Sequence, residues 1–91
     1  YTHFLADKTG RLVMEIYSNR QALIPEYASQ HPLCFHFAFA VTDAETEKNR
    51  LLKAGATLFE DLHLEDGSHL VMLRDPWGIP LQICQRATPM I

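Results

Sequence analysis

One short alternating stretch decides the fold: Cys34-Phe35-His36-Phe37-Ala38-Phe39-Ala40-Val41. Successive side chains of a β-strand point to opposite faces, so this pattern predicts a strand with two unlike faces. The bulky face, which suits packing under a helix, carries Phe35, Phe37, Phe39 and Val41. The other face carries Cys34, His36, Ala38 and Ala40. Because these residues are small apart from the imidazole, they leave space around His36, as a ligand cavity requires.

The residues after this strand predict a helix and then three more strands. The helix is expected to begin after Thr42, which forms a capping box with Glu45, and to end before Gly55 at the C′ position. Further strands are expected at 57–59, 69–74 and 79–85, with turns at Asp66-Gly67 and at 75–78. From His36 onward the predicted order is therefore β-α-β-β-β.

The start of the chain resembles its end. Strands are predicted at 2–6 and 12–17, followed by a linker without clear periodicity. The segment 2–7 matches 70–75, and each copy ends in an Asp-x-x-Gly turn. Each turn leads into an apolar strand with one polar side chain before an isoleucine, Glu15 in the first copy and Gln82 in the second. Their spacing from the preceding glycine differs by one residue, which a β-bulge would absorb.

Composition narrows the class of protein. With 91 residues, 47% of them hydrophobic, the chain is at most one globular domain. The net charge of −3 and the lack of a basic stripe argue against a nucleic-acid partner. No apolar run approaches the roughly 20 residues of a membrane span, and the residues after Tyr1 do not show the charged-then-apolar pattern of a signal segment. Two cysteines, Cys34 and Cys84, are interpreted as reduced, inert thiols of a cytoplasmic protein.

Three motifs, in this order, resemble the vicinal-oxygen-chelate superfamily of glyoxalases, bleomycin-resistance proteins and extradiol dioxygenases. The segment 10–17 is similar to the end of a first module, and 34–41 to the opening strand of a second. The segment 75–83 is similar to the end of that second module, with Gln82 where the family usually has Glu. The resemblance covers the whole chain.

The resemblance implies an α+β fold in which βαβββ modules form a half-open mixed β-barrel. Residues 1–18 correspond to the last two strands of a first module, 19–33 to a linker, and 34–91 to a complete second module. The first module is thus expected to be truncated. The favoured interpretation is that about 35 residues of strand, helix and strand precede Tyr1. Alternatively, these elements come from another molecule, or the protein uses a reduced barrel.

The resemblance also implies a metal site. His36 and Glu15 match ligand positions, Gln82 matches a third, and Glu15 is the candidate catalytic base. A neutral imidazole, a carboxylate and an amide oxygen suit Zn, Ni, Mn or Fe(II). Gln in place of Glu removes one negative charge and is expected to weaken binding of a divalent ion. The other histidines are interpreted as structural, surface or turn residues: His3, His31, His63 and His69.

The sequence leaves three possibilities for function open. The first is a metal-dependent lyase, isomerase or dioxygenase acting on a small oxygen-chelating metabolite. The second is a metal-free protein that binds a drug-like or aromatic small molecule, and the third is a fragment with no competent site. Exposed sheet edges and the resemblance both favour a homodimer.

Overall fold

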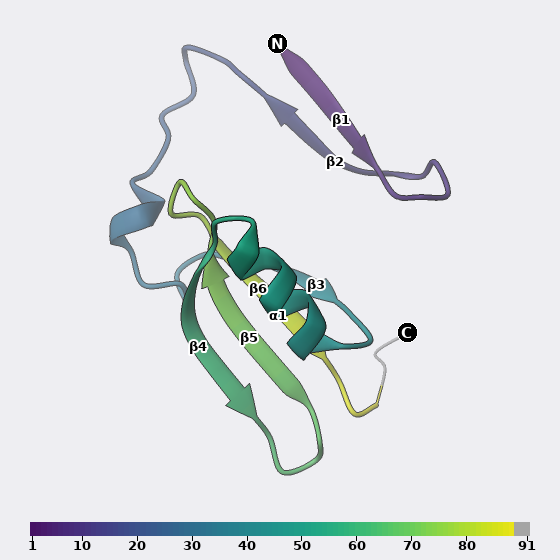
Figure 1. Cartoon of the computed structure of the whole chain (residues 1–91). Coiled ribbons are helices and arrows are strands. Elements are labelled where there is room, and N and C mark those ends of the chain that lie inside the picture. Colours follow the sequence, from purple (N-terminus) through teal and green to yellow (C-terminus); the bar gives the residue numbers. More distant parts are fainter. Residues whose placement is uncertain (89–91) are drawn as a thin grey trace.

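The computed structural model describes residues 1–88 and contains two open sheets and one α-helix, which confirms the predicted α+β class. Strands β1 (Thr2–Ala6) and β2 (Leu12–Tyr17) form an antiparallel hairpin. A linker with a short 3-10 turn, η1 (Tyr27–Ser29), leads to the larger sheet. Figure 1 shows the hairpin (purple) standing apart from that sheet.

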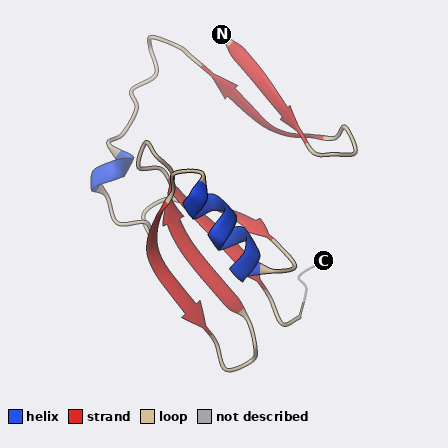
Figure 2. Cartoon of the chain, in the orientation of Figure 1, coloured by secondary structure: helices blue, strands red, loops and turns tan. Residues whose placement is uncertain are grey.

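The larger sheet has the strand order β3-β6-β5-β4. Its strands are β3 (Phe37–Ala40), β4 (Thr57–His63), β5 (His69–Arg74) and β6 (Pro80–Gln85). Strand β3 runs parallel to β6, and the other two pairings are antiparallel. The helix α1 (Ala44–Lys53) joins the two edge strands by crossing one face of the sheet, where it packs on β5 and β6 (Figure 2). The predicted β-α-β-β-β order is confirmed.

The core lies between α1 and the two central strands. Its fully buried members are Ala44, Val71 and Leu73, joined by nearly buried Ile83. Cross-strand pairing of Val71 with Ile83 places both side chains on the face that the helix covers. This rigid unit therefore fixes the side chains of β5 and β6.

Several boundaries differ from the sequence prediction. Strand β4 runs to His63 and not to residue 59, and β6 starts at Pro80 and not at Ile79. The strand expected to start at Cys34 starts at Phe37, because a turn intervenes in which the Cys34 amide donates to the His31 carbonyl. The helix is capped by Asp43 and not by Thr42: the Asp43 carboxylate accepts from the Thr46 amide and hydroxyl. The helix ends as predicted, with Gly55 at a positive φ of 111°.

The internal repeat is visible in the turns. In the first, Asp7 Oδ1 accepts from the amides of Thr9 and Arg11 at 2.8 and 3.1 Å. In the second, Asp75 Oδ1 accepts from the amides two and four residues later, both at 2.9 Å. Gly10 and the equivalent Gly78 share a φ of 89°. The two Asp-x-x-Gly turns are therefore the same structure.

A bulge restores the register of the two copies. The pairing of β1 with β2 shifts between Leu5 and Ala6, so that Phe4 lies opposite Glu15. In the second copy Met72 lies opposite Gln82. Because Phe4 and Met72 each precede their turn aspartate by three residues, Glu15 and Gln82 occupy equivalent places, as the predicted bulge requires.

Within residues 1–88, no helix has the length and apolar character that crossing a membrane requires.

Candidate functional site

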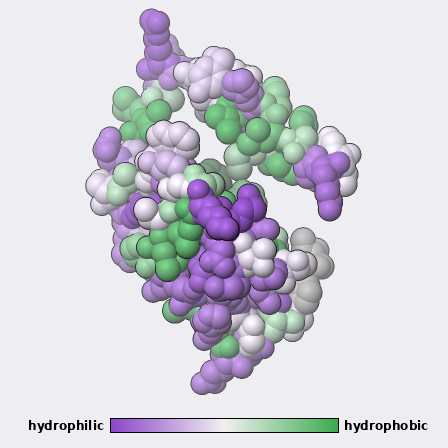
Figure 3. Space-filling model, in the orientation of Figure 1, coloured by the Kyte–Doolittle hydropathy of each residue, from purple (hydrophilic) through white to green (hydrophobic). Residues whose placement is uncertain are grey.

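A hollow of about 800 Å³ lies between the N-terminal hairpin, the linker and the start of β3. Figure 3 shows hydrophobic side chains (green) on the side of the hairpin that faces the rest of the molecule. Most of the walls are apolar or aromatic, as is usual for small-molecule sites. The walls are formed by Tyr1, Met14, Glu15, Ile16, Tyr17, Ser18, Asn19, Ala22, Leu23, Ile24, Pro25, Tyr27, Phe35, Phe37, Asp75 and Ile79.

Two carboxylates line this hollow, and they differ in their hydrogen bonding. Asp75 is engaged by backbone amides of its own turn. Glu15 lies in the middle of β2, is exposed, and pairs across the hairpin with Phe4. Glu15 is thus the wall residue whose carboxylate can face a bound molecule.

His36 comes immediately before β3 and is partly buried. Its Nδ1 lies 2.9 Å from the carbonyl oxygen of Pro32. A carbonyl oxygen can only accept, so Nδ1 carries the hydrogen and the lone pair of the neutral ring is on Nε2. This arrangement, one ring nitrogen tied to a backbone carbonyl, is typical of histidines that ligate metals through the other nitrogen.

Gln82 lies in the centre of β6, between Ala38 of β3 and Met72 of β5. Its Oε1 accepts a hydrogen bond from Cys84 Sγ at 3.2 Å, so both side chains share one face of the sheet, as predicted. Burial raises the pKa of the Cys84 thiol, which keeps the proton that this bond needs. Cys34, in contrast, is exposed.

The predicted ligand set is divided between two regions. Glu15 lines the hollow together with Phe35 and Phe37, whereas His36 and Gln82 are not among the residues of its walls in the described part of the chain. The assignment of His36, Glu15 and Gln82 as metal ligands therefore stays a prediction.

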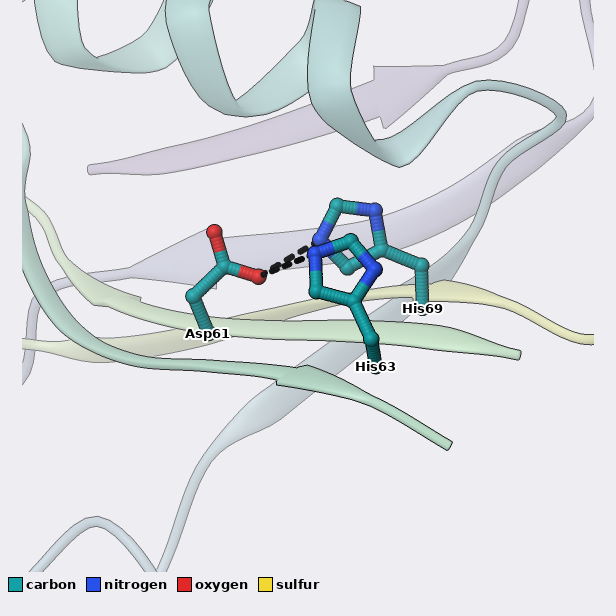
Figure 4. A group of neighbouring side chains, drawn as sticks. All are labelled: Asp61, His63 and His69. Atoms are coloured by element: carbon teal, nitrogen blue, oxygen red, sulfur yellow. Dashed lines mark hydrogen bonds and ion pairs between the residues drawn. The ribbon is translucent and has the colours of Figure 1, made fainter. Parts of the chain in front are cut away.

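A second cluster was not foreseen from the sequence. Asp61 and His63 of β4 meet His69 of β5, and their potential ligand atoms all lie within 4.8 Å of one another (Figure 4). His69 Nε2 lies 2.6 Å and His63 Nε2 3.5 Å from Asp61 Oδ1. The two imidazole rings stack with centroids 3.9 Å apart.

The interpretation of His69 as a surface or turn residue is wrong. It is only 6% exposed, because its strand position turns it toward α1. The pairing of His63 with His69 around the Asp66-Gly67 turn was the available signal, since residues opposite each other in a hairpin share a face. His63 is mostly exposed, as expected.

Asp61 is the electrostatic centre of this cluster. Its Oδ2 accepts from Lys48 Nζ of α1 at 2.8 Å, and its Oδ1 from His69 Nε2. The hydrogen bond from Lys48 holds the pKa of the Asp61 carboxyl below its ordinary value, and the bond from His69 adds to this against the opposing effect of burial. Asp61 is therefore ionised at neutral pH and links the helix to the hairpin.

Replacing Asp61 by asparagine is expected to lower the free energy of unfolding at neutral pH by about 1–3 kcal/mol, since the amide lacks the negative charge and offers only one acceptor oxygen to Lys48 and His69. A carboxyl whose folded pKa is lowered stabilises the fold above its unfolded pKa and loses that contribution as the pH falls through the folded pKa. The difference between Asp61→Asn and wild type should therefore shrink below about pH 3.8, the ordinary value. Denaturant unfolding at pH 7 and across the acid range measures it.

The control for this comparison is Glu60→Gln, an exposed neighbour on the same strand. It should change the unfolding free energy by no more than about 0.5 kcal/mol. An Asp61→Asn deficit that stayed constant down to the most acidic pH at which the fold survives would contradict the role given to the ionised carboxylate.

Comparison with known proteins bears on the fold and the family. No curated protein matches the chain. The crystal structure of SMU.1112c is similar, with 25% sequence identity and a TM-score of 0.46, and the match covers 89% of this chain and 56% of that one. The chain thus spans little more than half the length of that protein.

The Glyoxalase-like domain family matches residues 5–84. As this match extends over most of the sequence, the chain belongs to the glyoxalase-like domain family, in agreement with its resemblance to vicinal-oxygen-chelate proteins.

Proposed function

We propose that the chain contributes to a metal-dependent small-molecule site of lyase, isomerase or dioxygenase type, which acts on a small oxygen-chelating metabolite. The ligands are His36, Glu15 and Gln82. The single observation that carries this proposal is the bond between His36 Nδ1 and the Pro32 carbonyl, which fixes the tautomer that a metal ligand needs.

The donor chemistry of the three residues fits a divalent ion. His36 offers Nε2, Glu15 a carboxylate, and Gln82 an amide oxygen. The Gln82 oxygen has two lone pairs, so the hydrogen bond from Cys84 leaves one of them for a ligand bond. This mixed N/O set suits Zn, Ni, Mn or Fe(II). Such an ion, when bound, would act as a Lewis acid toward two neighbouring oxygens of the substrate.

The residues of the hollow supply the remaining functions. The aromatic walls, with Tyr27 and Phe37 among them, would hold the apolar body of a ligand. Glu15, which also lines the hollow, would take a proton from a carbon next to the chelating oxygens and return it. Glu15 thus keeps in this proposal the role of catalytic base that the family resemblance implies for it.

The domain organisation follows from the same reasoning. We assign residues 1–18 to the end of a first βαβββ module, 19–33 to a linker, and 34–91 to a second module. The element order and the two equivalent turns support this division. The hairpin also leaves backbone edges of β1 and β2 unpaired within the described residues, which favours a homodimer.

Metal analysis tests the proposal. The purified chain, after reloading and dialysis against metal-free buffer, is expected to retain one equivalent of divalent ion more than His36→Ala or Glu15→Ala does. His31→Ala and Glu26→Gln serve as matched controls and should retain it. Imidazole nitrogen resonances of His36 should shift on loading. Equal metal content in wild type and His36→Ala, or no response of the His36 ring, would rule out this site.

The hollow itself favours a second candidate, a metal-free protein that sequesters an aromatic small molecule. Its walls carry five aromatic side chains: Tyr1, Tyr17, Tyr27, Phe35 and Phe37. In the same experiment, this function is supported if His36 does not respond to any divalent ion while an aromatic dye binds the wild type and not Phe37→Ala.

A further inference from the structure

A group of metal-capable side chains lies outside the hollow. Asp61, His63 and His69 are not part of its walls. They project from the face of the larger sheet that α1 covers, since Lys48 of that helix reaches Asp61. The group lies near the loop end of the β4–β5 hairpin (Figures 1 and 4). It is therefore separate from the site built on His36 and Glu15.

The spacing of the three groups fits a single ion. Two ligands at zinc–nitrogen and zinc–oxygen distances of about 2.0–2.2 Å, in tetrahedral geometry, lie about 3.3 Å apart. The separations of Asp61 Oδ1 from the two Nε2 atoms, 2.6 and 3.5 Å, lie on either side of that value. Figure 4 shows both rings directed at the same carboxylate oxygen. An ion would take the place of the proton between His69 Nε2 and Asp61 Oδ1, and only small side-chain movements would be needed to admit it.

The sheet holds these side chains in place before any ion binds. His63 and His69 are directly opposite in the antiparallel pair, and Asp61 lies two residues before His63 on the same face. His69 is buried, and the stacked rings restrain each other. Lys48 engages Oδ2 and leaves Oδ1 directed at the imidazoles. The group is thus preorganised on rigid strands.

We propose that Asp61, His63 and His69 form a divalent transition-metal site, with Zn²⁺ as the best-suited ion. Two imidazoles and one carboxylate make a three-ligand set that leaves a fourth position for water. The positive charge of Lys48 opposes the ion and keeps its affinity moderate. His69 must present the lone pair of Nε2 to the ion, so the hydrogen of its bond to Asp61 moves to Nδ1 or to water when the ion binds.

Titration of the whole chain with Zn²⁺ tests this site directly. Ring-nitrogen resonances of His63 and His69 should shift together at one equivalent, and Co²⁺ should give the visible absorption of a four-coordinate site. His63→Ala, a mostly exposed position whose loss leaves the core intact, should weaken binding at least about tenfold, and Asp61→Asn likewise. His3→Ala, an exposed histidine of the hairpin, is the matched control and should bind as wild type does.

Lys48→Met separates a metal site from a purely ionic cluster. It keeps the aliphatic stem and removes the competing charge, so Zn²⁺ should bind about tenfold more tightly. His36→Ala should leave the response of His63 and His69 unchanged, which makes the outcome independent of the proposed function. Absence of a Zn²⁺ response at these two rings, or unchanged affinity in His63→Ala, would overturn the proposal.

Discussion

Replacing Gly78 by alanine should destabilise the fold by about 2–5 kcal/mol. The residue has a φ of 89°, in the left-handed region that costs other residues about 1–2 kcal/mol. A Cβ at this position would also lie 2.5 Å from the Cβ and 3.0 Å from the Cα of Ala28. Forcing these atoms apart adds about 1–3 kcal/mol, as in overpacked cores. Chemical denaturation of wild type and variant measures the sum.

Gly10 provides the matched control for this substitution. It has the same φ of 89° in the equivalent turn, but a Cβ there would meet nothing within 4 Å. Gly10→Ala should therefore cost no more than about 1–2 kcal/mol, the conformational contribution alone. Equal effects at the two positions would show that the contact with Ala28 does not restrain the fold.

The Gly78 substitution should also affect the hollow. Arg74 donates to the carbonyl oxygens of Gly78, Tyr27 and Gln30, which ties the linker to the turn after β5. Tyr27 is one of the walls of the hollow. Pushing Ala28 away displaces its neighbour, so dye binding in the hollow should weaken in Gly78→Ala and not in Gly10→Ala.

Truncating Leu73 to alanine should cost about 2–5 kcal/mol of unfolding free energy, because a fully buried leucine leaves a cavity. Leu73 contacts the small cluster that joins α1 to β5 and β6. A domain of this size has a total stability of roughly 5–14 kcal/mol, so the variant should be partly unfolded at moderate temperature. The midpoint of thermal or urea unfolding gives the measurement.

Leu23→Ala is the comparison, since this leucine is 95% exposed. It should alter the midpoint by less than the equivalent of about 0.5 kcal/mol. If Leu73→Ala were as mild as Leu23→Ala, the stability of the chain would have to reside outside the helix–sheet core.

Much of the fold could be predicted from the sequence because its signals are local. Both strands of the hairpin, β5 and the glycine turns follow from short, largely apolar segments bounded by turn residues, which are signals that act within a few residues. The start of β3 could not, because the segment before it is held by the turn between His31 and Cys34 and by the His36 ring on Pro32. Alternation alone contains no information on such bonds.

The candidate sites show the same division. The equivalence of Glu15 and Gln82 follows from an internal repeat, and the bulge that aligns them was expected. The convergence of His63 and His69 depends on the exact register of β4 on β5 and on the covering helix. The Asp66-Gly67 turn sets that register next to the loop, and the bulge between Leu58 and Glu60 lies farther along the strand. The burial of His69 under the helix is the part that strand alternation does not predict.

The duplicated turn has a consequence for how well each copy tolerates substitutions. Its shape is encoded in five consecutive residues, since the copy at 7–11 adopts it beside open space and the copy at 75–79 adopts it against Ala28. A motif that needs no neighbours can be moved between hairpins by recombination without redesign of its surroundings. The surroundings then decide the penalty beyond the one set by the positive φ: a side chain at Gly10 meets open space, whereas one at Gly78 also meets Ala28.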